Sequence, residues 1–241
     1  MPIPPAGRIV ILTGAGISAE SGIPTFRGHD GLWEGWRLED VATPQAFARD
    51  PGLVQRFYDM RRRALLAPGV APNAAHHALA RLERAWAGEV LVVTQNIDDL
   101  HERAGSRNLV HMHGELLKAR CLACAATWPC REDMAQAGAC PDCGTIGRAR
   151  PHVVWFGELP LHLDRITGAL QRCDLFVSIG TSGVVYPAAG FVAAVAAAGR
   201  AHTIEIDLVG SAVSTAFAEC RRGPASELVP ALVAKVLAVA A

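Results

Sequence analysis

The chain has 241 residues, of which 51% are hydrophobic and 19% are charged, a composition typical of a globular protein. Basic and acidic residues both number 23, so the formal net charge is zero and the basic surplus of most nucleic-acid-binding proteins is missing. No segment has the apolar length of a signal-peptide core or a membrane span. We therefore expect a cytoplasmic protein without nucleic-acid or membrane partners.

Short apolar runs rich in β-branched residues predict β-strands, and helix-compatible segments separate most of them. The runs occupy residues 8–13, 89–94, 152–155, 174–180 and 202–207. The candidate helices occupy residues 51–66, 74–86, 161–172, 187–198 and 227–240. Strands that are apolar throughout and alternate with helices are typical of a parallel sheet covered on both faces. The sequence therefore predicts an α/β fold with a doubly wound parallel sheet.

A glycine-rich turn follows the first predicted strand, at residues 13–19. Gly14, Gly16 and Ala19 fit the pattern G-x-G-x-x-A, in which small residues let a phosphate-binding backbone approach its ligand. An ordinary glycine turn explains so short a pattern about as well. A dehydrogenase would also need an acidic residue on a second strand about 20 positions later, but residues 24–31 are typical of a loop. Hydride transfer is therefore disfavoured.

Residues 29–50 contain two tryptophans and several turn residues but no predicted strand, and the helix at 51–66 follows them. On that helix Tyr58 and Arg61 are three positions apart and share a face. Because arginines also stand at 62 and 63, the residues alone favour a solvated basic stripe with Tyr58 half-packed. We expect Arg62 and Arg63 to tolerate alanine, since their side chains would point elsewhere.

Loops with polar residues follow three of the predicted strands, at the edge of a parallel sheet where ligands bind. They contain Gln95, Asn96, Ile97 and Asp98 after the second run, Gly180, Thr181 and Ser182 after the fourth, and Asp207 at the end of the fifth. Asn96 or Asp98 could equally cap the helix that follows, and capping is the role we expect of Asp99. Three such loops at one sheet edge favour a ligand site.

Cysteines in the region 118–150, which lacks sustained periodicity, predict a metal site. The pairs Cys121-x-x-Cys124 and Cys140-x-x-Cys143 are separated by 15 residues, a spacing typical of a four-thiolate zinc site. Such a site is closed, because its four sulfurs leave no position for water or substrate, so one structural zinc would stabilise a module. Three further cysteines are expected to be free and buried: Cys130, Cys173 and Cys220.

Taken in order, these motifs resemble the sirtuin family along the whole chain. The matching segments are GAGISAESGIPTFRG at 14–28, TQNIDDLHERAG at 94–105, HG at 113–114, RPHVVWFGE at 150–158 and GTSGVVYPAAG at 180–190. The resemblance implies a Rossmann-like domain with a small domain made of a helical module and a zinc ribbon. We expect the Rossmann-like domain at 1–28, 70–117 and 151–241, the helical module at 29–69 and the zinc ribbon at 118–150.

The resemblance also implies an NAD-dependent protein-lysine deacylase, whose partners are acylated lysine side chains of proteins. In that reaction nicotinamide leaves NAD, the acyl oxygen attacks the vacated ribose carbon, and a histidine acts as base towards a ribose hydroxyl. The products are free lysine and acyl-ADP-ribose. Chemistry alone does not separate His111 from His113 as the base, but the family motif, histidine directly before glycine, selects His113.

The site residues implied for NAD are Gly14, Ala15, Gly16, Ile17, Ala19, Phe26, Arg27, Gln95, Asn96, Ile97, Asp98, Gly180, Thr181, Ser182 and Asp207. The family usually has Asn where this chain has Asp207. For the substrate the resemblance implies Tyr58, Arg61, Val154, Phe156 and Gly157, the last three as an edge on which the peptide adds as a strand.

The Tyr-x-x-Arg pattern resembles that of sirtuins which remove acidic acyl groups such as succinyl and malonyl. An arginine and a phenol suit the carboxylate at the end of such a chain. Two other functions stay open at this point. One is mono-ADP-ribosyl transfer at the same NAD site. The other is a catalytically idle NAD-binding scaffold, against which the presence of His113, Asn96 and Asp98 argues.

Overall fold

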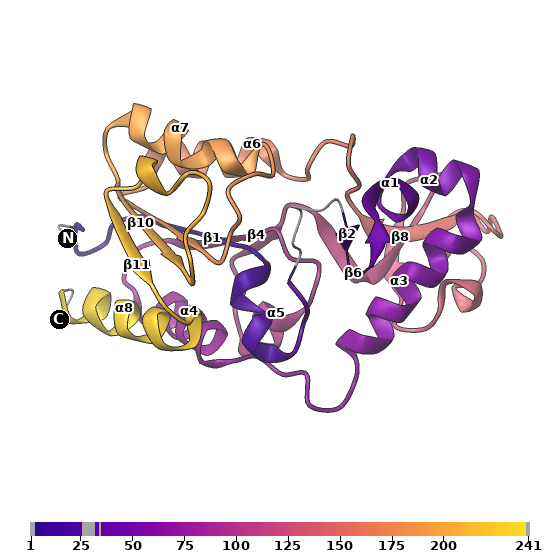
Figure 1. Ribbon diagram of the computed structural model, residues 1–241, viewed down its shortest axis with the longest axis horizontal. Helices are drawn as coiled ribbons and strands as arrows, with labels where there is room; N and C mark the ends of the chain where they lie inside the picture. Colours follow the sequence, from indigo (N-terminus) through magenta and orange to yellow (C-terminus); the bar gives the residue numbers. More distant parts are fainter. Residues whose placement is uncertain (1–2, 26–31, 34, 240–241) are drawn as a thin grey trace.

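The computed structural model describes residues 3–25, 32–33 and 35–239, and its largest element is a six-stranded parallel sheet (Figure 1). The strands are ordered β11-β10-β9-β1-β4-β5, and each neighbouring pair is parallel. Four of the predicted strands are confirmed, whereas β5 and β11 have no counterpart among the predictions. The bounds are β1 Ile9–Thr13, β4 Val90–Thr94, β5 Leu109–His111, β9 Leu175–Ile179, β10 His202–Asp207 and β11 Glu219–Arg222.

Helices cover both faces of this sheet, as Figure 1 shows. On β1, Ile9 and Ile11 enter one core with α4 and α8, while Val10 and Leu12 enter the other with α6 and α7. A strand alternates its side chains between two faces, so a run that is apolar throughout is what two covered faces require. The doubly wound α/β fold is thereby confirmed. The helix bounds are α4 Ala74–Ala85, α6 Leu163–Arg172, α7 Phe191–Ala198, preceded by η5 Ala188–Gly190, and α8 Ala225–Val239.

A smaller antiparallel sheet, ordered β7-β6-β8, lies at the end of the molecule away from both termini (Figure 1). The prediction that residues 152–155 belong to the parallel sheet is wrong, because β8 ends at Val153 and pairs antiparallel with β6. The run is apolar for a different reason: Val153 and Trp155 pack into a separate core with residues of α3. The bounds are β6 Gly114–Cys121, β7 Thr127–Pro129 and β8 Ala149–Val153.

Three helices accompany the small sheet: α1 (Leu38–Val41), α2 (Pro44–Arg49) and α3 (Pro51–Leu65). The short hairpin β2 (Leu32–Trp33) and β3 (Trp36–Arg37) precedes them, although no strand is expected there from the sequence. The last helix confirms the prediction at 51–66. Its start is fixed by Asp50, whose carboxylate accepts the Leu53 N–H at 2.8 Å, and by proline at the first helical position.

The arginines of α3 do not form a solvated stripe. Arg62 is fully buried, pairs with Asp59 at 2.6 Å and donates to the carbonyl of Leu116. Arg61 is only 8% exposed, so only Arg63, which is exposed and pairs with Asp133, fits the expected solvated stripe. The reason for expecting Arg62 to tolerate alanine therefore fails, because its loss would leave the buried Asp59 without a countercharge.

Shorter helical turns connect these elements. The turns are η1 (Ala15–Ile17), η2 (Ala19–Ser21), α5 (Leu100–Ala104), η4 (Met134–Gln136) and η6 (Ser214–Ala216).

None of the helices in the described part of the chain has the length and apolar character needed to cross a bilayer.

Candidate active site

A pocket of about 1560 Å³ lies between the carboxyl edge of the parallel sheet and the part of the molecule that contains α3 and β8. We call the part lined by the loops after β1, β4, β9 and β10 the sheet end, and the part lined by α3 and the loop after β8 the helical end. The predicted residues that line the pocket are Gly14, Ala15, Gly16, Ala19, Tyr58, Arg61, Gln95, Asn96, Ile97, Asp98, His113, Val154, Phe156, Gly157, Gly180, Thr181, Ser182 and Asp207.

Three predicted NAD residues are not among these lining residues. Ile17 is completely buried and belongs to the core between the sheet and α4 and α8. Its side chain therefore anchors the glycine turn from below. Phe26 and Arg27 lie outside the described residues.

The glycine turn after β1 packs directly on the loop after β9. A Cβ added to Gly14 would lie 2.6 Å from the Gly180 carbonyl oxygen, and one added to Gly16 would lie 2.6 Å from the Gly180 Cα. Gly16 donates its N–H to the Gly180 carbonyl at 2.9 Å. The small residues are thus required by a contact between two backbone loops, in addition to any approach of a ligand.

Three buried polar side chains of the sheet end form one network. Ser18 donates to Asp98 Oδ2 at 3.0 Å and accepts from Asn96 Nδ2 at 3.1 Å. Burial raises the pKa of Asp98 to about 6, against hydrogen bonds from Ser18 and the Leu100 N–H. Asp99 occupies the N-cap position of α5, but its side chain makes no capping hydrogen bond. Instead, the Oδ1 atom of Asp98 accepts the Leu100 N–H at 3.1 Å at the start of this helix. Sequence reasoning missed Ser18, although it stands inside the glycine motif.

The two candidate histidines differ in what their ring nitrogens face. Both nitrogens of His111 face acceptors: Nδ1 lies 3.1 Å from the Asn96 carbonyl and Nε2 lies 2.7 Å from Glu102. An acceptor on each side requires a proton on each nitrogen. Burial alone would lower the pKa of His111, but the hydrogen bond and charge of Glu102 raise it above its ordinary value. Both ring nitrogens of this histidine are thus engaged by acceptors, so it is poorly suited to act as a base.

His113 lines the pocket, and its Nδ1 lies 3.1 Å from the Gln95 carbonyl. Because a carbonyl can only accept, Nδ1 carries the proton of the neutral ring and Nε2 keeps its lone pair. Burial lowers the pKa of His113, against the opposing effect of the Gln95 carbonyl. The ring is therefore neutral near pH 7 and able to accept a proton.

Tyr58 and Arg61 line the helical end of the pocket, although only a small part of either side chain is exposed. The Tyr58 hydroxyl accepts from the Trp155 indole at 3.0 Å, and burial raises the pKa of Tyr58, so the phenol stays protonated. Arg61 donates to the Phe57 carbonyl at 3.2 Å, and its guanidinium carbon lies 3.4 Å from the centre of the Phe57 ring. The helical end of the pocket is therefore apolar but contains one phenol and one guanidinium group.

The loop after β8 is held by an ion pair across its ends. Arg150 bonds both carboxylate oxygens of Glu158, at 2.6 and 2.8 Å, and its guanidinium stacks over the Trp155 ring. The N–H groups of Val154 and Phe156 bond to the carbonyls of His113 and Ala42. Sequence reasoning missed the role of Arg150 and Glu158, although opposite charges at the two ends of one motif were a visible signal.

The remaining predicted residues of the sheet end lie on the β9 and β10 loops. Thr181 lies with its hydroxyl 2.9 Å from that of Ser178. Asp207 ends β10, and its Oδ1 accepts the N–H groups of Val209 and Gly210 at 3.0 and 2.8 Å. One carboxylate oxygen of Asp207 therefore shapes the following loop while the side chain also lines the pocket.

The four cysteines of the two pairs converge, as their spacing predicts. The Cys121 and Cys143 sulfurs are 3.7 Å apart, those of Cys124 and Cys140 are 3.6 Å apart, and all four lie within 4.8 Å of one another. Tetrahedral zinc, with bonds of about 2.3 Å to sulfur, places its ligands about 3.8 Å apart, so this cluster fits zinc. The other cysteines are free, and Cys130 and Cys173 are buried as expected, but Cys220 is exposed.

The fold and these sites define a Rossmann-like α/β protein with a dinucleotide-type pocket and a four-thiolate metal centre. A model of the Sir2 family matches residues 14–187. A relative from Vibrio cholerae, named NAD-dependent protein deacylase, is 58% identical over 98% of this chain and 96% of its own length. The chain belongs to the Sir2 family.

Solved structures agree with this assignment. A Sir2 homologue solved in complex with NAD superposes with a TM-score of 0.86 at 42% identity, over 97% of this chain and 91% of that chain. A mutant Sir2 homologue in complex with 2′-O-acetyl ADP ribose superposes with a TM-score of 0.84 at 41% identity, over 97% of this chain and 93% of that chain. The predicted family is therefore confirmed.

Proposed function

We propose that this chain is an NAD-dependent protein-lysine deacylase that transfers the acyl group to ADP-ribose and releases nicotinamide. The observation that carries the proposal is the meeting, in one pocket, of the glycine loop, Asn96, Asp98 and the neutral His113. Relatives that carry the name NAD-dependent protein deacylase support it, as do the NAD and acetyl ADP ribose complexes of related structures. A zinc ion held by the four cysteines would stabilise the ribbon and take no part in the reaction.

NAD would lie along the sheet end as a substrate. In our proposal its phosphates face the backbone of the turn after β1 and the loop after β9, where Gly14, Ala15, Gly16 and Ala19 leave room for them. Ile17 would support this turn from the core rather than contact the phosphates. The further residues proposed for NAD are Phe26, Arg27, Gln95, Asn96, Ile97, Asp98, Gly180, Thr181, Ser182 and Asp207. The buried network of Ser18, Asn96 and Asp98 supports this assignment, because it offers polar atoms in a site largely closed to water.

The proposed base is His113. Once nicotinamide has left, the acyl oxygen bonds to the ribose carbon, and a ribose hydroxyl must lose its proton to attack the resulting imidate. One water molecule is then consumed as the lysine amine leaves, which gives acyl-ADP-ribose. His113 Nε2 would take the proton of the ribose hydroxyl. The lowered pKa of His113 keeps its ring neutral near pH 7, and the Gln95 carbonyl fixes the tautomer that leaves the Nε2 lone pair free. His111 would instead stay paired with Glu102 and hold the segment between β5 and β6 in place.

The acylated lysine of a protein would enter from the helical end. Val154, Phe156 and Gly157 are proposed to offer the edge along which the peptide lies. Large apolar side chains exposed at the pocket rim support an interaction with another chain. At the helical end they are Met60 and Phe156.

We further propose that acidic acyl groups such as succinyl and malonyl are preferred over acetyl. Arg61 and Tyr58 support this preference, because both line the helical end and are suited to pair with a carboxylate. An acetyl group offers no carboxylate and would therefore lack this charge-assisted contact.

The small domain, at 29–69 and 118–150, is proposed to contribute the acyl end of the site, and the remainder of the chain the NAD end. A cytoplasmic location is proposed because none of the seven cysteines forms a disulfide, as in a reducing compartment. The zero net charge supports the absence of a nucleic-acid partner.

A single assay tests the proposed function. Purified protein is incubated with NAD and one peptide that carries acetyl, malonyl or succinyl lysine, and the products are identified by mass spectrometry. We expect free lysine, nicotinamide and acyl-ADP-ribose in equal amounts. Nicotinamide release with ADP-ribose attached to protein would replace the proposal by ADP-ribosyl transfer. Intact NAD in all reactions would leave a binding scaffold.

A further inference from the structure

A buried carboxylate of the parallel sheet has no role in the proposed chemistry. Glu205 stands on β10 and is only 1% exposed. Its neighbours Ile204 and Ile206 point to the core with α4 and α8, so Glu205 points to the opposite face. A charged side chain at such a position needs partners, since burying a lone carboxylate is very unfavourable.

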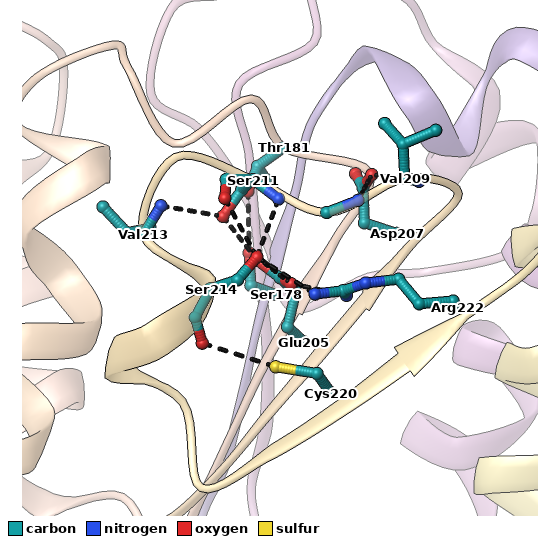
Figure 2. Close-up of polar contacts among 11 residues, drawn as sticks. Ser178, Thr181, Glu205, Asp207, Val209, Ser211, Val213, Ser214, Cys220 and Arg222 are labelled. Atoms are coloured by element: carbon teal, nitrogen blue, oxygen red, sulfur yellow. Dashed lines mark hydrogen bonds and ion pairs between the residues drawn. The ribbon is translucent and has the colours of Figure 1, made fainter.

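The partners come from the segment that follows β10 and from β11 (Figure 2). One carboxylate oxygen of Glu205 accepts the Ser211 hydroxyl, and the other accepts the Ser214 hydroxyl and the Arg222 guanidinium, each at 2.6 Å. Arg222 also donates to Ser214 Oγ at 3.1 Å. Burial raises the pKa of Glu205, but the two hydroxyls and Arg222 together lower it below its ordinary value, so the carboxylate stays charged.

This network holds part of the pocket wall. Residues 208–212, which we call the β10 loop, all line the pocket at the sheet end. Ser211 belongs to this loop, and Arg222 lies under Gly210, where an added Cβ would be 2.9 Å from the guanidinium. The Ala212 N–H bonds to the Ser182 carbonyl at 3.0 Å, which joins this loop to the loop after β9. Glu205 therefore fixes the shape of the wall from behind without lining the pocket.

Fold stability alone accounts poorly for this arrangement. Replacing a buried ion pair by apolar side chains is often neutral or stabilising, because both charges must lose their water. A network of this kind instead selects one conformation among several, since only one places every donor on the carboxylate. Here the segment held in one conformation is residues 208–212, which form part of the pocket wall.

The sheet order indicates which half of NAD meets this wall. β10 and β4 are separated by β9 and β1, which makes three strand spacings. At about 4.8 Å each, they place the two strand ends roughly 14 Å apart. The reactive ribose must lie near His113, whose ring is held by Gln95 just after β4. An extended dinucleotide that begins there reaches β10 with its adenosine half.

We propose that Glu205 is a positioning residue for the adenosine half of NAD, acting through Ser211, Ser214 and Arg222 on the β10 loop. This inference rests on the proposed function. The loss of Glu205 should weaken binding of the adenosine half while leaving the chemistry at His113 and the acyl-lysine site unchanged. Neither a purely stabilising role nor a catalytic one gives that combination.

The test measures ADP-ribose binding by calorimetry, together with steady-state kinetics for NAD and for one acylated peptide. For Glu205→Ala we expect ADP-ribose affinity to fall about 10- to 100-fold and KM for NAD to rise in parallel, as expected when charge-assisted hydrogen bonds are lost. Values of kcat, KM for the peptide and inhibition by nicotinamide should stay within about 2-fold. Glu205→Gln, which keeps an acceptor for one hydroxyl, should recover part of the affinity.

Glu219→Gln is the matched control. Glu219 is a strand glutamate too, paired with Arg221 at 2.7 Å and His202 at 3.2 Å, but it does not line the pocket or contact the β10 loop. Its replacement should leave ADP-ribose affinity unchanged. If Glu205→Ala lacks a cooperative thermal transition, Ser214→Ala and Arg222→Met take its place with the same expected direction.

A folded Glu205→Ala variant, or folded Ser214→Ala and Arg222→Met variants, with wild-type ADP-ribose affinity would overturn the inference. An equal loss in kcat or in peptide binding would overturn it as well, since it would indicate general damage. If the wild-type protein neither turns over NAD nor binds ADP-ribose, the proposed function itself fails. An active wild type with unaffected variants defeats only the role of Glu205.

Discussion

At the sheet end of the pocket, polar groups bond to one another and to loop backbone, as Ser18, Asn96 and Asp98 do. At the helical end, Tyr58 and Arg61 are instead embedded among the apolar side chains of α3 and the loop after β8. The polar arrangement of the sheet end suits NAD, which is the same in every turnover. The apolar arrangement of the helical end suits the acyl group, which varies between substrates and is recognised by the end of its chain. Changes at the sheet end should therefore affect all acyl substrates alike, and changes at the helical end should separate them.

The largest expected effect is that of His113→Ala. Loss of a general base reduces turnover by about 100- to 10,000-fold, and the loss should be the same for acetyl and succinyl peptides. NAD binding and the thermal transition should be kept. The control His111→Ala should lower stability through the unpaired Glu102 but reduce turnover far less. Equal losses of turnover in two well-folded variants would make the assignment of the base wrong.

Arg62→Ala tests whether the buried ion pair between Arg62 and Asp59 stabilises the fold. Removing one partner of a buried ion pair typically costs about 3–5 kcal/mol, and Arg62 is fully buried against Asp59. We expect a large fall in the free energy of unfolding, measured with urea, without a change in the ratio of succinyl to acetyl activity. Arg63→Ala, which changes only an exposed pair with Asp133, should change the free energy of unfolding far less.

Acid should destabilise the folded protein through two buried histidines, His76 on α4 and His101 on α5. Burial lowers the pKa of His76 to about 4 and that of His101 well below its ordinary value, and their rings lie 4.9 Å apart. The unfolded chain binds protons at about pH 6.5, so the stability that neutral His76 contributes is full above that pH. It is lost as the pH falls towards 4, by roughly 3 kcal/mol.

Urea unfolding of wild type and His76→Gln at several pH values isolates this contribution. The difference in unfolding free energy between the two proteins should shrink as the pH falls from 7 to 4. The comparison with the variant matters because Asp98, whose pKa is raised, acts in the opposite direction. A difference that stays constant with pH would contradict the assignment to His76.

Arg61→Met tests the helical end directly. A hydrogen bond to a charged group contributes about 1.5–3 kcal/mol, so desuccinylation should fall roughly 10- to 150-fold in kcat/KM. Deacetylation should be spared, because His113 and the sheet end are untouched. Tyr58→Phe should act in the same direction but less. If acetyl and succinyl activities fall together, Arg61 only supports the packing of α3.

The smallest effect is expected for the preference between NAD and NADP. The Asp207 carboxylate lines the pocket at the end of β10 and would repel a 2′-phosphate, so NAD should be preferred over NADP. Asp207→Asn should narrow that preference by a few fold while keeping most NAD turnover, since an amide oxygen can still accept from Val209 and Gly210. Equal use of both cofactors by the wild type would remove Asp207 from the ribose.

The sequence alone was sufficient for the strands that are buried on both faces, because an apolar run as short as residues 9–13 fits few places in a fold except a covered sheet. It was insufficient for β11, a strand of Glu219, Cys220 and two arginines whose side chains are half-buried or exposed. It was also misleading at Arg62, where a charged residue next to two other arginines looks solvated unless the partner carboxylate is visible.

The sequence likewise predicted some residues of the candidate site and missed others. Local patterns selected the glycine loop and the zinc ligands, and the family motif selected His113. The structure brings the glycine loop and His113 to one pocket and the four cysteines to one separate cluster. The supporting residues could not be found in that way. Ser18 acts through Asn96 and Asp98, about 80 residues further along the chain, and no local pattern encodes such a contact. The partners of Glu205 and Arg150 are nearer in sequence, but the spacing of charged residues alone does not show which of them become buried and paired.

The contact between Gly14, Gly16 and Gly180 also constrains the order of events during synthesis. The turn after β1 emerges from the ribosome first, but the loop against which it packs is made after two-thirds of the chain. β1 can pair with β4 early, while its other edge must wait for β9. The nascent protein therefore has an open strand edge and no complete nucleotide site through most of translation.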